Sequence, residues 1–98
     1  MPELLTPQHF EPLLHQRFTL CVDENTSFDV ELIEVRALPR SGSVPAREPF
    51  SLTFRGPREY YVPQRVYALQ NETLGKQDIF LVPIGPDDIG HRYQAIFN

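Results

Sequence analysis

Apolar and polar residues alternate along much of the chain from residue 17 onward, and a period of two is typical of β-strands with one buried face. Apolar residues occupy every second position of 18–22 and, after the polar cluster 23–27, of 28–32. At Ile33 the apolar positions shift by one residue. This change of phase predicts a β-bulge, which bends a strand and helps a sheet to close. The alternative is a strand end that is covered on both faces.

Further strands follow a loop that is expected at residues 38–47, where prolines, a glycine and serines cluster. Phe50 starts a strand whose odd-numbered positions, 51, 53 and 55, are expected to face outward, and Gly56-Pro57 is expected to end it. Residues 66–69 form another strand pattern, which is followed by a turn at Leu74-Gly75.

The C-terminal part of the chain predicts two more strands. Residues 79–82 form a continuous apolar run, which is typical of a strand covered on both faces, and Pro83 and Gly85-Pro86 are expected to end it. Residues 87–90 have the composition of a turn, and alternation resumes from Tyr93 to the C-terminus.

The segment before residue 17 predicts one short helix. Thr6 is suited to the N-cap, and Pro7 falls at the first helical position, where its missing N–H has no cost. Pro12 predicts a kink or a break into two single turns. Such a helix must pack on something, and we expect it over an open end or edge of the sheet. Its apolar stripe comprises Phe10, Leu13 and Leu14.

These patterns together predict an all-β fold, a small antiparallel barrel or sandwich of six to seven strands with one short N-terminal helix. The 98 residues suffice for one domain, spanning 1–98. The predicted core consists of Phe18, Leu20, Val30, Leu32, Phe50, Leu52, Phe54, Leu69, Leu81, Tyr93 and Phe97.

Composition narrows the class of protein. A single cysteine, Cys21, allows no internal disulfide and no CxxC pair. No apolar run approaches the roughly 18 residues of a membrane span, and the first residues lack the basic start and apolar stretch of a signal peptide. The sequence therefore predicts a cytoplasmic protein without a membrane span.

The net charge of −4 is unevenly distributed. Residues 36–65 hold six arginines and two glutamates, for a net +4, while the rest of the chain holds three cations and eleven acids, for a net −8. Such asymmetry can mark a surface for an acidic partner, although a mixed solvent-facing surface gives the same counts. The acidic balance and the absence of known motifs argue against nucleic acid as a partner.

Residues that could carry chemistry are few. His9 and His15 are six positions apart and form no i, i+4 metal pair. Asp87, Asp88 and His91 lie in one turn, where aspartate also has an ordinary role in bonding to the backbone. Cys21 has no base near it in sequence. The sequence therefore predicts no enzyme, no metal site and no cofactor, and leaves a minor hydrolase using Asp87, Asp88 or Cys21 as the weakest hypothesis.

One segment has the composition of an interaction surface. Residues 58–65 place two tyrosines and two arginines close to Pro57 and Pro63. Tyrosine and arginine are enriched at protein interfaces. Because neighbouring side chains of an extended segment point to opposite sides, one tyrosine is expected to be buried and the other to lie in a contact surface. The predicted partner-binding residues are Arg55, Arg58, Tyr60, Tyr61 and Arg65.

Several blocks resemble a known family. They read PFSL-F-GP at residues 49–57 and LFLVP-GP followed by RY-A-FN at residues 79–98, with Ile79 in place of the first leucine. The chain is similar over nearly its whole length to short bacterial domains of unknown function, some of which lie near genes for phage-tail-collar-like proteins. The resemblance implies a structural or accessory role beside a tail-like or surface assembly, and it supplies no catalytic residues.

The leading hypothesis is a non-enzymatic interaction or assembly protein that binds another protein or forms a homo-oligomer. The second is a small-ligand or carbohydrate binding module with a pocket at one end of the barrel. Interiors of small barrels are often filled by side chains, which argues against the second.

Overall fold

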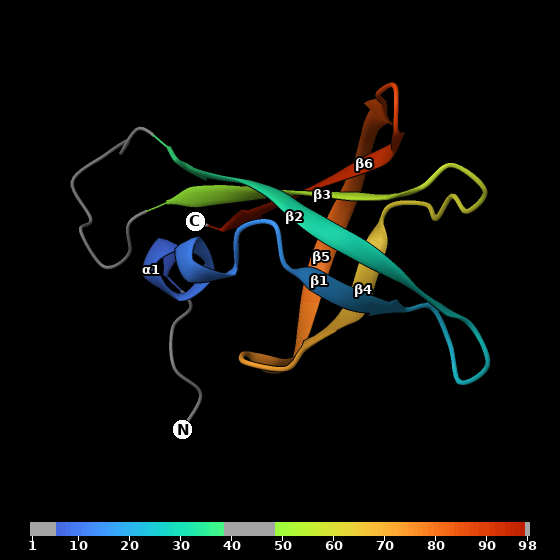
Figure 1. Cartoon of the computed structure of the whole chain (residues 1–98), viewed down its shortest axis with the longest axis horizontal. Helices are drawn as coiled ribbons and strands as arrows, with labels where there is room; N and C mark the ends of the chain where they lie inside the picture. The colour runs from blue at the N-terminus through green and yellow to red at the C-terminus, as the bar shows by residue number, and fades with distance from the viewer. Residues whose placement is uncertain (1–5, 39–48, 98) are drawn as a thin grey trace.

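The computed structural model describes residues 6–38 and 49–97, which form one closed antiparallel barrel of six strands (Figure 1). The predicted fold class is confirmed, as a barrel. The predicted loop 38–47 lies, except for Leu38, outside the described residues. The elements are α1 (Pro7–Phe10), the 3-10 turn η1 (Glu11–Leu13), β1 (Arg17–Cys21), β2 (Ser27–Ala37), β3 (Phe50–Pro57), β4 (Arg65–Asn71), β5 (Gly75–Pro86) and β6 (Gly90–Phe97).

The strand order around the barrel is β1-β2-β3-β6-β5-β4, and β4 pairs back onto β1. The long strand β2 serves two neighbours, since its first half pairs with β1 and its second half with β3. The register of the β2–β3 pair shifts between Leu32 and Glu34, which confirms the bulge predicted at Ile33. The bulge bends β2 and so allows one strand to belong to two sides of the barrel.

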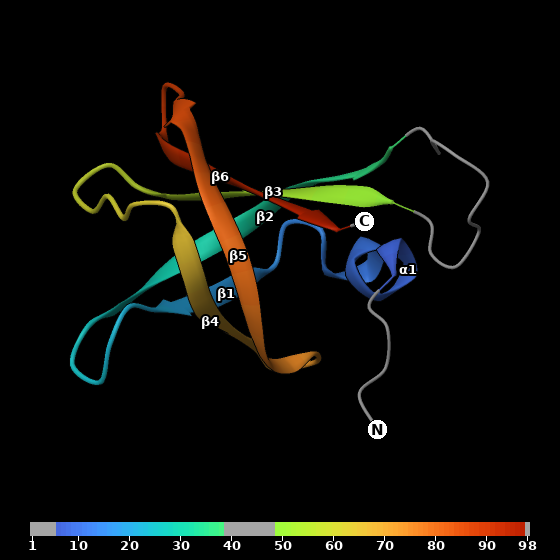
Figure 2. The same ribbon diagram turned by 180° about the vertical axis from the view of Figure 1, so that it is seen from behind.

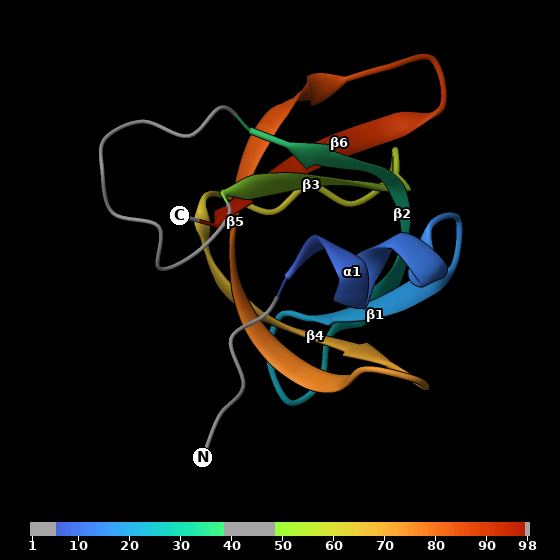
Figure 3. The same ribbon diagram turned by 90° about the vertical axis from the view of Figure 1, so that its left-hand side faces the viewer.

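The N-terminal turns cover one open end of the barrel, as expected (Figure 3). Phe10 is fully buried, and its ring lies 5.9 Å from that of Phe50 and 6.0 Å from that of Phe97. The helix breaks into two short turns before Pro12, as predicted. Leu14 was expected in the same apolar stripe but is exposed, because the chain is already extended there. Within residues 6–38 and 49–97, no helix has the length and apolar character needed to cross a membrane.

The predicted core is confirmed at ten of its eleven positions. Phe97 is only half-buried, because it lies at the rim of the barrel, where its ring stacks on Phe50 at 4.6 Å. The core also contains residues that were not in the predicted core: Phe10, Leu13, Phe28, Val62, Tyr67, Ile79 and Ala95.

The strand end predicted at Gly56-Pro57 is confirmed, because β3 ends at Pro57, where it pairs with Gly90 of β6. A Cβ on Gly56 would lie 3.1 Å from Val30 Cγ1 and 3.2 Å from Phe28 Cε2, so this glycine makes room in the core. β5 ends at Pro86, as Gly85-Pro86 predicted, but it passes through Pro83, which was also expected to end it. β4 pairs with β5 only to Leu81, so beyond that point β5 is an edge toward β4, where a proline is tolerated.

Two burial predictions on the strands also need correction. Phe80 lies in the apolar run expected to be covered on both faces, yet it is 49% exposed on the outer side of β5. Ser51 and Thr53 were expected to face solvent but are buried. The Thr53 hydroxyl donates to Glu34 Oε1 at 3.3 Å, so the outer side of β3 is covered by side chains of its neighbour β2.

Candidate functional site

The outer surface of the barrel is divided into an apolar and a charged wall. Throughout the described strands, every large apolar side chain that is exposed belongs to β4, β5 or β6, which are adjacent in the barrel (Figure 2). Val66 and Phe80 lie directly opposite each other on β4 and β5. We call this surface the apolar wall, formed by Val66, Phe80, Ile84 and Ile96.

The other wall, over β1–β3, carries ion pairs instead. His15 Nδ1 lies 3.2 Å from Glu31 Oε2, and Arg17 Nη1 lies 3.7 Å from Asp29 Oδ2. A third pair joins Arg55 Nε to Asp87 Oδ2 at 2.8 Å and is about three-quarters buried. A partner would therefore meet apolar side chains on one wall and charged side chains on the other.

The segment 58–64, between β3 and β4, covers the end of the barrel opposite α1. Val62 is buried, and its N–H donates to the Tyr93 hydroxyl at 3.3 Å. That hydroxyl donates in turn to the carbonyl of Tyr60 at 3.5 Å. The Tyr67 hydroxyl donates to the carbonyl of Pro63 at 2.6 Å. The segment is therefore held to the barrel by two core tyrosines.

Burial raises the pKa of both anchoring tyrosines, Tyr67 and Tyr93. The nearby Tyr61 phenol raises each of these pKa values further, whereas Arg65 lowers that of Tyr67. These phenols therefore remain protonated donors at neutral pH, as their hydrogen bonds require.

The prediction that one of Tyr60 and Tyr61 is buried is wrong, because the two rings are 53% and 58% exposed. Val62 is the buried residue of the segment instead, and both tyrosines lie on the surface. Tyr60 stacks on Phe28 with ring centroids 5.4 Å apart and an interplanar angle of 17°. Tyr61 contacts the ring of His91 edge-on at 5.4 Å. Both rings are thus supported by the barrel.

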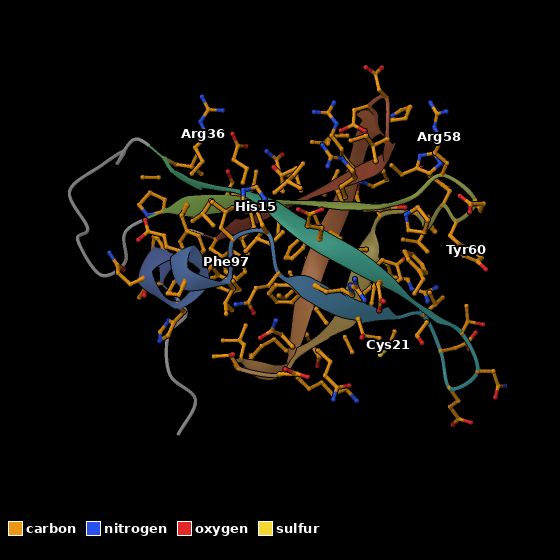
Figure 4. All side chains as sticks on the ribbon, viewed as in Figure 1. His15, Cys21, Arg36, Arg58, Tyr60 and Phe97 are labelled. Atoms are coloured by element: carbon orange, nitrogen blue, oxygen red, sulfur yellow. The ribbon has the colours of Figure 1, made fainter. Side chains whose placement is uncertain are left out.

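The arginines predicted to bind a partner are not equivalent. Arg55 is about three-quarters buried and paired with Asp87. Arg58 is exposed in the turn after β3 (Figure 4). Arg65, at the start of β4, lies over the ring of Tyr67 at 5.3 Å. The structure therefore separates the predicted residues: Tyr60 and Arg55 line a hollow on the charged wall, whereas Tyr61 contacts His91 of β6 and Arg65 lies at the start of β4.

We call this second feature the Tyr60 hollow. It is a surface depression of about 600 Å³ between the start of β1, the first half of β2 and the end of β3. Its lining comprises His15, Arg17, Phe28, Asp29, Val30, Glu31, Arg55, Gly56, Pro57, Tyr60 and Ile89. A second depression of about 600 Å³ lies beside it, between β1 and the turn after β4, and is lined mainly by polar residues without phenylalanine or tyrosine.

His15 has an unusual backbone conformation at the edge of this hollow. Its φ of +69° lies in the left-handed region, which is uncommon for a residue other than glycine. Its N–H donates to the carbonyl of Leu32 at 2.7 Å, and the N–H of Leu32 donates to the carbonyl of Gln16 at 3.1 Å. These two bonds fix the junction between η1 and β1 on β2 and so place the imidazole beside Glu31.

Asp87 organises the predicted turn at residues 87–90, which is confirmed. Its Oδ1 accepts the N–H groups of Ile89 at 2.8 Å and Gly90 at 2.9 Å, and its Oδ2 accepts Arg55 Nε. These backbone hydrogen bonds, followed by the Arg55 guanidinium, lower the pKa of Asp87 from 3.8 to about 2. By accepting these three hydrogen bonds, the carboxylate holds the β5–β6 turn against β3.

Stability should therefore depend on Asp87 in acid. Because the folded-state pKa is lowered, the contribution of the carboxylate is present above about pH 4 and is lost as the pH falls toward about 2. The Asp87→Asn variant should lose stability less steeply than the wild type over that interval, as measured by thermal unfolding at a series of pH values. Parallel pH profiles for the two proteins would contradict this assignment.

The other candidate catalytic residues are not gathered at either depression. Cys21, Asp87 and Asp88 line neither hollow, and the His91 ring contacts Tyr61. His9 accepts the N–H of Thr6 through Nδ1 at 2.9 Å, at the start of α1. Within the described residues, no group of three or more His, Cys, Asp or Glu side chains could hold a metal ion. The structure adds no observation in favour of the hydrolase hypothesis.

The apolar wall is what the sequence patterns missed. Phe80 was assigned to a covered strand, and Val66, Ile84 and Ile96 carry no motif. The only signal was the excess of apolar residues on both sides of the last strands, which does not tell an exposed residue from a buried one.

The fold and surfaces define a small closed β-barrel with a helical turn over one end and an aromatic segment over the other. Residues 5–97 match the model of a family described as a domain of unknown function (DUF6916). The chain belongs to this family, in agreement with the resemblance noted in the sequence. Neither the curated proteins nor the solved structures gave a match.

Proposed function

We propose that this protein is a non-enzymatic interaction module that binds another protein through the apolar wall and through the exposed ring of Tyr61 in the segment 58–64. The observation that supports the proposal is the grouping of exposed apolar side chains on β4–β6, opposite a wall of ion pairs. Contiguous exposed apolar surface rimmed by polar residues is typical of interaction sites. Tyr61 adds a supported aromatic ring of the kind that forms interface hot spots.

Charge indicates the chemistry of the partner. Arg65 is the first residue of β4, and Arg92 lies on β6, where its Nε donates to the carbonyl of Gly85 at 3.3 Å. Arginines beside apolar and aromatic side chains suit an acidic protein surface, because guanidinium groups bind carboxylates with two hydrogen bonds. The partner surface we propose is therefore apolar at its centre and acidic at its rim.

The family resemblance supports a more specific role. It implies an accessory part of a phage-tail-like or surface assembly, so the partner would be a component of such an assembly. Purification of the tagged protein at native abundance under gentle conditions tests this directly. Recovery of a defined partner supports the assembly role, and recovery of the chain alone as a monomer counts against it. A homo-oligomer whose contacts lie on the apolar wall would identify the partner as a second copy.

The variant Tyr61→Ala should weaken partner binding by about 1–3 kcal/mol while leaving the melting temperature nearly unchanged. Its ring is more than half exposed and contacts the barrel only edge-on, so its removal should not disturb the core. Quantitative pull-down and thermal unfolding of the same preparation measure both effects.

Leu14→Ala is a matched control, since Leu14 is also an exposed apolar residue but lies near the opposite end of the barrel. This variant should bind as the wild type does. If Tyr61→Ala lowers the melting temperature sharply and binding survives, the segment has a structural role and the interface lies elsewhere.

A further inference from the structure

The Tyr60 hollow carries an inference that is independent of the protein-binding role. Figure 4 shows His15 in front of β2 and Tyr60 on the loop that follows β3, and the hollow lies between the elements that hold these two residues. We propose that the hollow is a binding site for a neutral saccharide, which stacks on Tyr60 and forms hydrogen bonds with the flanking ion pairs.

Tyr60 provides a fixed platform. One face of its ring is stacked on Phe28, while about half of its surface remains open to solvent. Its backbone is held on both sides, because its N–H donates to the carbonyl of Pro57 at 3.4 Å and its carbonyl accepts the Tyr93 hydroxyl. An aromatic face is electron-rich, so it attracts the slightly positive C–H groups on one face of a pyranose ring. Because the platform is fixed before binding, stacking costs little conformational entropy.

Ile89 extends this apolar surface. It lies in the β5–β6 turn, lines the same hollow and is 64% exposed. Asp87 holds the turn through the N–H groups of Ile89 and Gly90. A saccharide on Tyr60 would therefore have a second apolar contact from a separate, firmly held turn.

The polar lining suits hydroxyl groups. His15 with Glu31, and Arg17 with Asp29, are exposed pairs in which a nitrogen donor and a carboxylate acceptor lie side by side. Arg55 adds donors from a guanidinium that Asp87 already orients. A sugar hydroxyl both donates and accepts, so neighbouring hydroxyls can use the donor and the acceptor of one pair together.

Charge balance favours a neutral ligand. Two arginines and two carboxylates line the hollow, and these four formal charges cancel. A phosphate or carboxylate ligand would face Asp29 and Glu31, and a cationic one would face arginines. A purely apolar ligand would cover these charges without forming the hydrogen bonds they need. A neutral molecule with many hydroxyls and one apolar face meets all of these requirements.

The test is a titration of the ¹⁵N-labelled full chain with maltotriose, cellotriose and chitotriose, followed by NMR. We expect at least one of the three to shift the signals of Tyr60, Phe28 and Glu31, while amides of α1 stay unchanged. The Tyr60→Ala variant should weaken that binding about tenfold or more, because its stacking surface is lost. Tyr60→Phe, which keeps the ring, should bind nearly as the wild type does.

Two further variants make the outcome specific. Glu31→Gln should weaken binding severalfold by removing one charged acceptor, and Tyr61→Ala, which changes the other side of the segment, should have no effect. The proposal is overturned if none of the three trisaccharides shifts these signals. It is also overturned if Tyr60→Ala remains folded and binds with unchanged affinity, or if glucose 6-phosphate binds more tightly than the neutral sugars. Because Tyr61→Ala affects only the protein-binding role, either proposal can fail without the other.

Discussion

Replacing Phe54 by alanine should lower the free energy of unfolding by about 3–5 kcal/mol, the range typical of a fully buried aromatic residue. Phe54 is completely inaccessible to solvent at the centre of β3, and its ring meets that of Phe18 edge-on at 5.2 Å. Truncation leaves a cavity between β1, β2 and β3 that the closed barrel cannot easily fill by collapse. Urea unfolding followed by circular dichroism measures the loss.

Phe80→Ala is the matched control, because it removes the same side chain from a strand of the same barrel. Phe80 is about half exposed on the apolar wall, so its loss should cost much less, about 1 kcal/mol or below. Equal destabilisation by the two variants would contradict the assignment of inner and outer faces. Weakened partner binding by Phe80→Ala with little change in stability would in addition support the apolar wall as the interface.

The second large effect is expected at Gly90, the first residue of β6. A Cβ at this position would lie 1.9 Å from the backbone carbonyl oxygen of Gly56 on β3. Neither backbone can move without breaking the β3–β6 pairing or the turn in which Asp87 binds the Gly90 N–H. Gly90→Ala should therefore destabilise the barrel by about 3 kcal/mol, at the upper end of what overpacking costs.

Gly75→Ala is the comparison that separates this clash from the general cost of replacing glycine. Gly75 has a φ of +82°, and a Cβ there would meet nothing within 4 Å, so only the backbone conformation opposes the change. We expect a loss of about 1 kcal/mol in the same unfolding experiment. A Gly90→Ala protein as stable as Gly75→Ala would mean that β3 and β6 are farther apart than described.

The period of two along the chain was sufficient to predict the fold class, the bulge in β2 and more than half of the core. These features follow from local physical rules: a strand with one buried face must alternate, and a change of phase requires an extra residue. The break at Pro12 and the turn at 87–90 were predictable for the same reason, since proline and aspartate act on their immediate neighbours.

The course of β5 and the surfaces were decided by contacts between distant residues. Pro83 is tolerated within β5 because β4 has already ended beside it, and Gly56 has no room for a side chain because Val30 and Phe28 lie next to it. These neighbours are distant in sequence, so Pro83 was interpreted as an ordinary strand breaker.

The candidate site was likewise predictable where it depended on local composition and unpredictable where it depended on contacts between distant residues. The tyrosines and arginines of the segment 58–65 predicted a partner-binding surface, but the composition could not show which side each tyrosine ring would face. That depended on Val62 being buried, with its N–H bonded to the Tyr93 hydroxyl, and on Phe28 lying where Tyr60 could stack on it. The sequence by itself determined an antiparallel β fold and much of its interior, because the alternation of apolar and polar residues is a property of near neighbours in the chain. Only the tertiary structure separated an apolar wall from a charged hollow, because the residues of each surface come from strands that meet only when the barrel closes.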